Sequence, residues 1–360
     1  MELEYPTTVA ERIADQASRL VRRSFIKGCV DDMTTDPAVY APYVSTGDLP
    51  AEEHVRLLVN DAFHRFRANA DGDVSHVYPS LATVDPDRFG ICVANTRGLT
   101  AAAGDAEIQF SIMSVAKPFV FALMCGTHNP DTVARFVGLN ATGRRFNSVA
   151  AIEDRPDGRT NPMVNPGAIA TTSMAPGKNT EEKWRFIQEG LSRFAGHELT
   201  IDDEIFASAS ATNAINRAIG DLLRGYGRLA TDAEQTVDLY TRQSCLKVTA
   251  SDLAVMAATL ASGGVNPTTR EQVIDQVSCR CALVVMATAG LYETSGEWLY
   301  TIGLPGKSGI GGGIVMVSPG KGGLGTFAPR LDPAGNSVKG QLAAAFLSRQ
   351  LGLDLFVSTP

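Results

Sequence analysis

The chain has 360 residues, of which 44% are hydrophobic and 20% are charged, a composition typical of globular proteins that excludes a collagen, a coiled coil or a largely disordered chain. Its formal net charge of −7 provides no overall attraction to phosphate backbones, so no nucleic-acid partner is expected. No apolar run approaches the roughly 20 residues that span a bilayer, so no membrane partner is expected.

Residues 1–75 predict a helical lead-in. Apolar residues recur at spacings of three and four over Val9–Phe25 and again over Ala51–Ala68, a pattern typical of helices that lie on a core. The segment between them is rich in turn-forming residues and predicts a loop. The acidic, polar start resembles no secretory signal, so a cytoplasmic location is expected.

Beyond residue 75, strand patterns come first and helical patterns follow. FGICVA and LTAAAGD flank a turn at Asn95–Gly98 and predict a β-hairpin. Residues 114–292 are expected to be mostly helical. Their clearest helix is TASDLAVMAATLASGG, where Thr249 and Asp252 have the spacing of a capping box. The stretch Thr171–Thr180 predicts a surface loop.

Strands return near the end of the chain. EWLYTIGLP, GGIVMVSPG and LGTFAP each predict a strand, and an amphipathic helix over Ser337–Leu351 is expected to close the chain. Strands at both ends of this region with a helical block between them indicate an α/β sheet domain that carries an inserted all-α subdomain.

The histidines and cysteines do not indicate a metal site. The five histidines form no HExxH motif and no i, i+4 pair, so neither a metal nor another cofactor is expected. The cysteines are scattered without the spacing of metal ligands, and we expect reduced, mostly buried thiols. They are Cys29, Cys92, Cys125, Cys245, Cys279 and Cys281.

The glycine-rich segment GLPGKSGIGGG does not predict a phosphate-binding loop. The Walker pattern requires glycine five residues before Gly306, where this chain has Thr301. The segment also leads from one strand-like stretch into another, so it lacks the helix N-terminus that binds phosphate. It predicts instead a strand at the sheet edge, where lysine and small residues line a cleft.

Two short motifs predict nucleophilic chemistry. Ser114-Val-Ala-Lys117 begins an apolar helix and places a hydroxyl and an amine on one face, one turn apart. A lysine whose pKa is lowered by burial can act as the base for such a serine. Lys307-Ser308-Gly309 lies on a late strand, and this pairing is typical of penicillin-recognising serine enzymes.

The chain resembles the serine-dependent glutaminases of the β-lactamase-like fold. The resemblance runs from about Tyr78 to Phe356 and rests on several stretches in order. They include YPSLATVDPDRFGICV, FSIMSVAKP, VGLNATGRRFNS, RTNPMVNPGAIATTS, GLYETSGEWLYTIGLPGKSGIGGGI and LDPAGNSVKG. It implies a β-lactamase/penicillin-binding-protein-like sheet domain, a catalytic domain over 76–360 with its helical subdomain at about 118–290, and a homodimer or homotetramer.

The resemblance also implies roles for single residues. It makes Ser114 the nucleophile, Lys117 its base and Tyr292 the residue that passes a proton to the leaving amine. The reaction implied is hydrolysis of L-glutamine to L-glutamate and ammonia through an acyl-enzyme. The backbone N–H groups of Ser114 and Ile310 match an oxyanion hole. The remaining matches bind the substrate head group or, for the strand lysine, keep Lys117 partly neutral: Asn165, Asn216, Tyr240 and Lys307.

The chain departs from the family pattern where that pattern binds the head group. Ala209 stands where the family has a glutamate for the α-ammonium group, and Val77 where it has a tyrosine, with Tyr78 one place later. Met113 replaces a glutamine and Pro166 an alanine. A desolvated ammonium without its carboxylate costs roughly 3 to 5 kcal/mol. These changes favour an amidase whose specificity has shifted to another amide.

Three alternatives remain open. In the first, one of Asp202, Asp203 and Glu204 replaces the missing glutamate in an ordinary glutaminase. In the second, the chain is a lactam hydrolase or another acyl-transfer enzyme of the same fold. In the third, it is a protein that uses the pocket for binding without catalysis.

Overall fold

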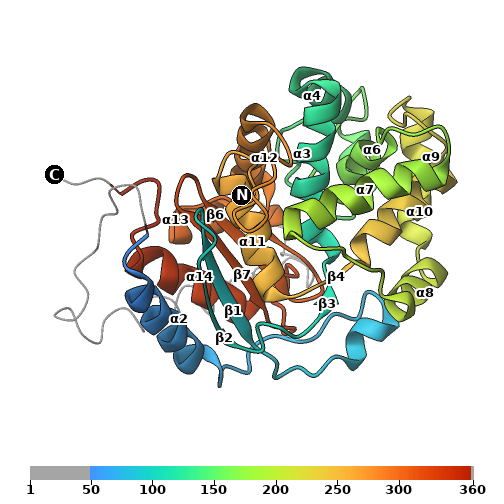
Figure 1. Cartoon of the computed structure of the whole chain (residues 1–360). Coiled ribbons are helices and arrows are strands. Elements are labelled where there is room, and N and C mark those ends of the chain that lie inside the picture. Colours follow the sequence, from blue (N-terminus) through green and yellow to red (C-terminus); the bar gives the residue numbers. More distant parts are fainter. Residues whose placement is uncertain (1–48, 358–360) are drawn as a thin grey trace, which may run out of the picture. The chain divides into compact units, whose positions relative to one another are not determined.

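The computed structural model describes residues 49–357, all within one compact unit, Val44–Pro360. The helix expected over Val9–Phe25 lies outside the described residues. The described chain is built on an antiparallel sheet of five strands in the order β2-β1-β7-β6-β5 (Figure 1). The strands are β1 (Gly90–Asn95), β2 (Thr100–Gly104), β5 (Gly306–Ser308), β6 (Gly313–Ser318) and β7 (Gly322–Phe327). The predicted hairpin and the last two predicted strands are confirmed.

Both faces of the sheet are buried, because successive side chains of a strand point to opposite faces. On β6, Ile314 and Met316 join one apolar cluster, whereas Val315 and Val317 join another. This two-sided burial explains why GGIVMVS reads as a continuous apolar run in the sequence. Strand β5 lies at the end of the sheet order, as expected for an edge strand.

Helices cover the two faces of the sheet. Helices α2 (Glu52–Phe66) and α14 (Val338–Gln350) share an apolar cluster with one face. Helix α11 (Ala250–Ala261) packs on the other face and lies between the sheet and the helical block (Figure 1). Both interactions of the predicted capping box at Thr249 are present. The helices expected over Ala51–Ala68, in TASDLAVMAATLASGG and over Ser337–Leu351 are therefore confirmed.

The helical block follows β2 and precedes β5 in the chain. Its central helix, α3 (Ala116–His128), is buried along ten successive residues and packs against α6 (Asn165–Ser173), α7 (Thr180–Ala195) and α12 (Gln276–Ala289). A two-stranded sheet of β3 (Phe110–Ser111) and β4 (Lys247–Val248) lies apart from the main sheet. The other helices of this region are α4 (Pro130–Val137), α5 (Ala150–Glu153), α6 (Asn165–Ser173), α7 (Thr180–Ala195), α8 (Asp203–Ala211), α9 (Ala214–Gly225), α10 (Ala233–Ser244) and α12 (Gln276–Ala289).

The strand predicted in EWLYTIGLP is wrong, because residues 295–302 form a helix and the strand begins only after this stretch. In α13 (Ser295–Ile302) the side chains of Trp298 and Ile302, four residues apart, are each 3% exposed, whereas Tyr300 is 92% exposed. This helical periodicity is hidden in a short run that is rich in aromatic and branched residues. Gly303, with φ of 74°, ends the helix, and the strand begins only at Gly306.

The surface loop predicted over Thr171–Thr180 is wrong in its first part. Helix α6 continues to Ser173, and Thr171, Thr172 and Ser173 are buried. The hydroxyls of Thr171 and Thr172 donate to the carbonyl oxygens of Gly167 and Ala168, at 2.7 and 2.9 Å. Hydroxyls that bond to the preceding helical turn can be buried at little cost, so a polar composition does not indicate a loop here.

Helix α11 approaches the central strand β7 so closely that side chains on the strand would clash. Gly325 pairs with Cys92 on one side and with Val315 on the other. A Cβ atom on Gly325 would lie 2.1 Å from the carbonyl oxygen of Ala250 in α11. The contact therefore requires glycine at this position.

We expect Gly325→Ala to lower the free energy of unfolding by about 1–3 kcal/mol, because the added methyl group must push helix and strand apart. Gly296→Ala is the matched control, since a Cβ atom on that exposed residue of α13 would meet no atom within 4 Å. Urea unfolding followed by circular dichroism measures both variants. Equal midpoints would contradict the assignment of a tight contact.

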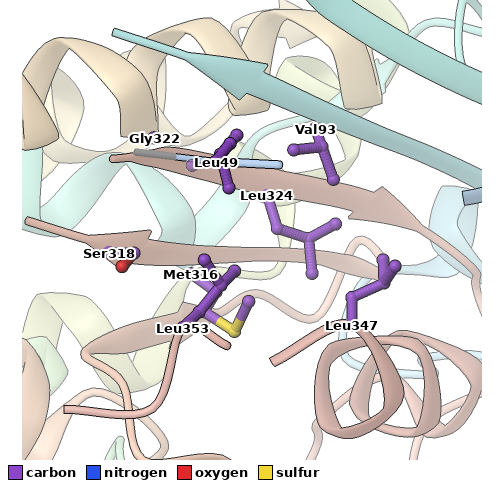
Figure 2. A pocket seen from close by; sticks show the side chains of 9 residues that line it. Leu49, Val93, Met316, Ser318, Gly322, Leu324, Leu347 and Leu353 are labelled. Carbon is purple, nitrogen blue, oxygen red and sulfur yellow. The ribbon is translucent and has the colours of Figure 1, made fainter. Parts of the chain in front are cut away.

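A small cavity lies beneath the sheet. Figure 2 shows Met316 and Leu324 from neighbouring strands together with Leu347 from α14 and Leu353. The cavity measures about 10 Å³, at most room for one water molecule. It is a packing defect of the core and not a ligand site.

Two further expectations concern the described residues. No helix between residues 49 and 357 is long and apolar enough to cross a membrane. Five of the six cysteines are described, all are free, and Cys281 is the one that is partly exposed. Cys29 lies outside the described residues.

Candidate active site

Ser114 is presented by a strained turn. It lies in the 3-10 turn η2 (Met113–Val115), which leads directly into α3. Met113 has φ of 47°, a backbone region that residues other than glycine rarely adopt. The Ser114 side chain is only 8% exposed. Backbone strain of this kind persists where the surrounding structure over-determines the conformation, and it gathers at functional sites.

Glycines bring the end of β5 onto this turn. A Cβ atom on Gly309 would lie 3.2 Å from the backbone nitrogen of Ser114, and one on Gly311 would lie 2.5 Å from the carbonyl oxygen of Ser111. Ile310, between these glycines, packs with Met113 in one apolar cluster. The backbone around Ile310 therefore lies beside the backbone of Ser114.

Lys117 is a buried amine that burial makes less basic. Its side chain is 2% exposed, and its amine donates to the Asn165 Oδ1 at 2.7 Å and to the Met163 carbonyl oxygen at 3.4 Å. Burial lowers the pKa of Lys117 from 10.5 to about 7, because desolvation disfavours the charged form. A substantial fraction of this amine is therefore neutral near neutral pH.

A chain of buried amides leads away from Lys117. Asn165 Oδ1 also accepts a hydrogen bond from the Tyr240 hydroxyl at 3.0 Å, and Asn165 Nδ2 donates to Asn216 Oδ1 at 2.9 Å. Asn216 Nδ2 donates in turn to Asn213 Oδ1 at 2.6 Å. Since each amide donates away from Lys117, the oxygen of Asn165 must face the amine, and its orientation is defined.

Tyr292 and Lys307 share one acceptor on β5. The carbonyl oxygen of Ser308 accepts from the Tyr292 hydroxyl at 3.2 Å and from the Lys307 amine at 2.7 Å. The Lys307 amine lies 4.0 Å from the centre of the Tyr292 ring. Tyr292, like Met113, has a positive φ, at 58°. Both halves of the site are thus built on strained backbone.

The pKa values of this second group also respond to burial. Burial raises the pKa of Tyr292 to about 12, against the opposing effects of hydrogen bonds with Ser114 and Ser308. Burial, followed by the charge of Lys117, holds the pKa of Lys307 well below its usual value. Ser114 thus affects the pKa of Tyr292, and Lys117 affects the pKa of Lys307. These side chains lie close enough to influence one another's protonation.

All the residues predicted from the sequence are brought together. Hydrogen bonds and electrostatic interactions join them into one buried cluster. Ile310 belongs to it because it packs with Met113 and because its neighbours Gly309 and Gly311 pack on the turn that holds Ser114. They are Ser114, Lys117, Asn165, Asn216, Tyr240, Tyr292, Lys307 and Ile310. Such an arrangement of hydroxyl, neutral amine and phenol can support nucleophilic acyl transfer.

Val77 and Tyr78 differ in their exposure to solvent. Val77 is 47% exposed, whereas Tyr78 is largely buried, which raises its pKa to about 12, and it hydrogen-bonds to Asn216. Tyr78 also contributes to the raised pKa of Tyr240. Tyr78, at the start of η1 (Pro79–Thr83), and not Val77 is therefore the side chain that turns toward Asn216.

Ala209 lies in an apolar environment. It is 1% exposed and packs with Met113, Ile310 and Cys245. Its nearest acidic residues in sequence do not enter this cluster. Asp202 accepts a hydrogen bond from the backbone N–H of Ile205 as the N-cap of α8, while Asp203 and Glu204 are exposed. Their positions do not support a replacement of the missing glutamate by one of these three carboxylates.

Several residues near the site were missed by sequence reasoning. Phe146 packs on Tyr292, with ring centres 5.1 Å apart, and its carbonyl oxygen accepts from the backbone N–H of Asn165 at 2.7 Å. Asn213 continues the amide chain, and Asn336 contacts Ser308. Phe146 and Asn336 lie in two of the family-like stretches, VGLNATGRRFNS and LDPAGNSVKG, so membership of those stretches was the available signal.

Comparisons with known proteins agree on one family. The family model described as Glutaminase matches residues 72–356. "Glutaminase 2" of Yersinia pestis is 60% identical over 333 residues, covering 92% of this chain and 98% of the relative. The glutaminase of Colwellia psychrerythraea is 42% identical over 307 residues, covering 85% of this chain and 99% of the relative.

Solved structures show the same relationship. A probable glutaminase, ybaS, superposes with a TM-score of 0.83 at 38% identity, covering 85% of this chain and 99% of that chain. The protein Mglu in its glutamate form has a TM-score of 0.79 at 36% identity, covering 86% of this chain and 71% of that chain. These neighbours share the mixed α/β architecture with its antiparallel sheet.

Proposed function

The chain belongs to the glutaminase family, and from this premise we propose that it hydrolyses the side-chain amide of L-glutamine to L-glutamate and ammonia through an acyl-enzyme on Ser114. One observation carries the proposal. Ser114 lies at the start of a helix that also holds a buried lysine with a pKa of about 7, and it lowers the pKa of the buried Tyr292 against the larger effect of burial. The family and the geometry support the same reaction class.

In the acylation step, Lys117 acts as the general base. Its neutral amine accepts the proton of the Ser114 hydroxyl, and the Ser114 oxygen attacks the carbonyl carbon of the side-chain amide. A base whose pKa lies near the working pH is present in substantial part in its neutral form and is still basic enough to accept the proton. Lys307 is buried in the same cluster, and burial together with the charge of Lys117 lowers its pKa, so two charged amines side by side are disfavoured.

The tetrahedral intermediate then loses its nitrogen. The backbone N–H groups of Ser114 and Ile310 hold the oxyanion, which the close packing of Gly309 on Ser114 supports. Tyr292 passes its proton to the leaving nitrogen, which departs as ammonia, and the protonated Lys117 returns a proton to the Tyr292 phenolate. Water next gives a proton to Lys117 as its oxygen attacks the ester carbonyl. Breaking the ester bond passes that proton to the Ser114 oxygen, releases glutamate and restores Ser114.

The amide chain next to Lys117 binds the substrate head group. Asn165, Asn216 and Tyr240 are proposed for this role, and Tyr78 joins them through its contact with Asn216. Each side-chain amide has a second N–H beside the one used in the chain, and that N–H can donate to an anionic oxygen of an α-carboxylate.

The apolar surroundings of Ala209 favour a second candidate substrate. Ala209, Met113 and Ile310 carry no charge to pair with an α-ammonium group. An amide whose α-nitrogen is acylated would place an uncharged group there and avoid a desolvated, unpaired cation. We therefore propose N-acylated glutamine as the second candidate.

Ammonia release from purified protein tests both candidates. L-glutamine should be hydrolysed, and L-asparagine should react at least about 100-fold more slowly, because a shorter side chain misplaces the amide carbonyl. N-acetyl-L-glutamine is the matched comparison. A kcat/KM that is higher for the acetylated compound would assign the specificity to it, and no ammonia from either compound would contradict the proposed function.

Three finer points are also proposals. We assign the catalytic domain to residues 76–360, with its helical subdomain at about 118–290, and we expect a homodimer or homotetramer from the family. A cytoplasmic location is supported by the five free cysteines of the described region, since reduced thiols persist in a reducing compartment.

A further inference from the structure

Asn336 lies between two elements that hold Tyr292. The residue is fully buried, at 0% exposure, in the loop before α14. Its side-chain oxygen accepts a hydrogen bond from the Ser308 hydroxyl at 2.5 Å, and its side-chain nitrogen donates to the Thr294 hydroxyl oxygen at 3.0 Å. Asn336 thereby joins strand β5 to the turn η3 (Tyr292–Thr294).

Each of these two contacts holds one end of Tyr292. Ser308 provides the carbonyl oxygen that accepts from the Tyr292 hydroxyl. Thr294 closes the turn from which Tyr292 projects, because its hydroxyl donates to the Leu291 carbonyl oxygen at 2.8 Å. That turn holds Tyr292 at a φ of 58°. The position of the phenol therefore depends on how β5 and η3 are joined.

Asp332 sets the orientation of the Asn336 side chain. Its carboxylate accepts from the Asn336 backbone N–H at 2.9 Å, from the Gln341 side-chain nitrogen at 3.0 Å and, more distantly, from Asn336 Nδ2 at 3.5 Å. A carboxylate can only accept, so Nδ2 must face Asp332 and Oδ1 must face Ser308. The amide is thus held in one orientation.

We propose that Asn336 is a positioning residue for Tyr292. Its amide holds β5 and η3 at a fixed position relative to each other, so that the Tyr292 hydroxyl stays near both the Ser308 carbonyl oxygen and Ser114. Asn336 acts only through Tyr292, because its side chain contacts Ser308, Thr294 and Asp332 and not the nucleophile. This inference rests on the proposed function, in which Tyr292 protonates the leaving nitrogen.

The choice of leaving group separates this role from a general structural one. An amide nitrogen must be protonated to leave, whereas p-nitrophenolate leaves as an anion. We expect Asn336→Ala to lower kcat for L-glutamine by about 10- to 100-fold, because a misplaced acid loses most of its effect. The KM for L-glutamine should change by less than about twofold, because Asn336 acts on the departure of the leaving group and not on the binding of the substrate. Hydrolysis of the γ-p-nitrophenyl ester of glutamate should stay within about threefold of wild type.

Three further variants make the test decisive. Thr294→Val removes the acceptor of Asn336 Nδ2 at constant shape, and it should show the same selective loss to a smaller degree. It carries the test if Asn336→Ala fails to fold. Asn266→Ala is the matched control, because Asn266 is equally buried but donates to the carbonyl oxygens of Arg193 and Phe194. Its reaction with both substrates should match wild type.

Tyr292→Phe distinguishes failure of this inference from failure of the proposed function. It should slow amide hydrolysis selectively and more strongly than Asn336→Ala. If Tyr292→Phe slows amide and ester equally, the proposed role of Tyr292 is wrong. If Tyr292→Phe is selective but Asn336→Ala slows both substrates equally, or neither, the positioning role of Asn336 is overturned.

Discussion

Replacing Ser114 with alanine is expected to lower ammonia release from L-glutamine by about 10⁴- to 10⁶-fold, because the nucleophile of the acyl-enzyme is then absent. The fold should be kept, since the change removes one oxygen atom from a turn whose backbone is held by β5 and α3. Acid quenching during turnover, followed by mass spectrometry of the intact protein, should detect a covalent glutamyl adduct on the wild type and none on Ser114→Ala.

A second buried serine provides the control for this variant. Ser318 lies on β6, is 2% exposed and has no hydrogen-bond partner for its hydroxyl. Ser318→Ala should retain wild-type turnover and form the same adduct. Retention of a tenth or more of the activity by Ser114→Ala would rule out Ser114 as the nucleophile.

Replacing Lys117 with methionine is expected to lower kcat by about 10²- to 10⁴-fold, the usual contribution of a general base. The wild-type rate should rise with pH through about 7 and level off above it, because Lys117 accepts a proton only when neutral and burial lowers its pKa to about 7. Lys117→Met should lose this dependence, since no amine remains to titrate. The pH profile of kcat from ammonia release measures both effects.

The Lys117 prediction has a control and a test of cooperation. Lys321→Met removes another amine with a lowered pKa, one that donates to the Gly352 carbonyl oxygen outside the site, and the rate and profile should not change. Residues that act as a unit have non-additive effects. The double variant Ser114→Ala, Lys117→Met should therefore lose no more activity than Ser114→Ala alone. A profile unchanged in Lys117→Met would exclude Lys117 as the base.

Local patterns in the sequence were sufficient for much of the fold. The hairpin around Asn95–Gly98 and the capped helix after Thr249 depend on turn chemistry and periodicity within a few residues, and both are confirmed. EWLYTIGLP was misassigned because eight helical residues span too few turns to show their period against a run of aromatic and branched residues. Only packing, with Trp298 and Ile302 buried and Tyr300 exposed, distinguishes the two structures.

Part of the active-site chemistry was also predicted from the sequence. Ser114 and Lys117 are three positions apart where η2 leads into α3, so local spacing was enough to pair them. Lys307 came from its own Lys-Ser-Gly motif, whereas Tyr292 and Asn165 came from the family resemblance, because no local rule connects those two positions to Ser114. The inward turn of Tyr78, by contrast, could not be read from a motif that places the tyrosine at Val77.

The sequence thus determined the fold class and the family and predicted the nucleophile and its base, since these depend on local spacing or on stretches that can be compared directly. Tertiary structure alone decided the rest. Burial of Lys117 sets its pKa, the shared Ser308 carbonyl oxygen joins Tyr292 to Lys307, and Asn336 connects β5 to η3. The physical reason is that desolvation and hydrogen-bond geometry arise only when segments distant in the chain pack together.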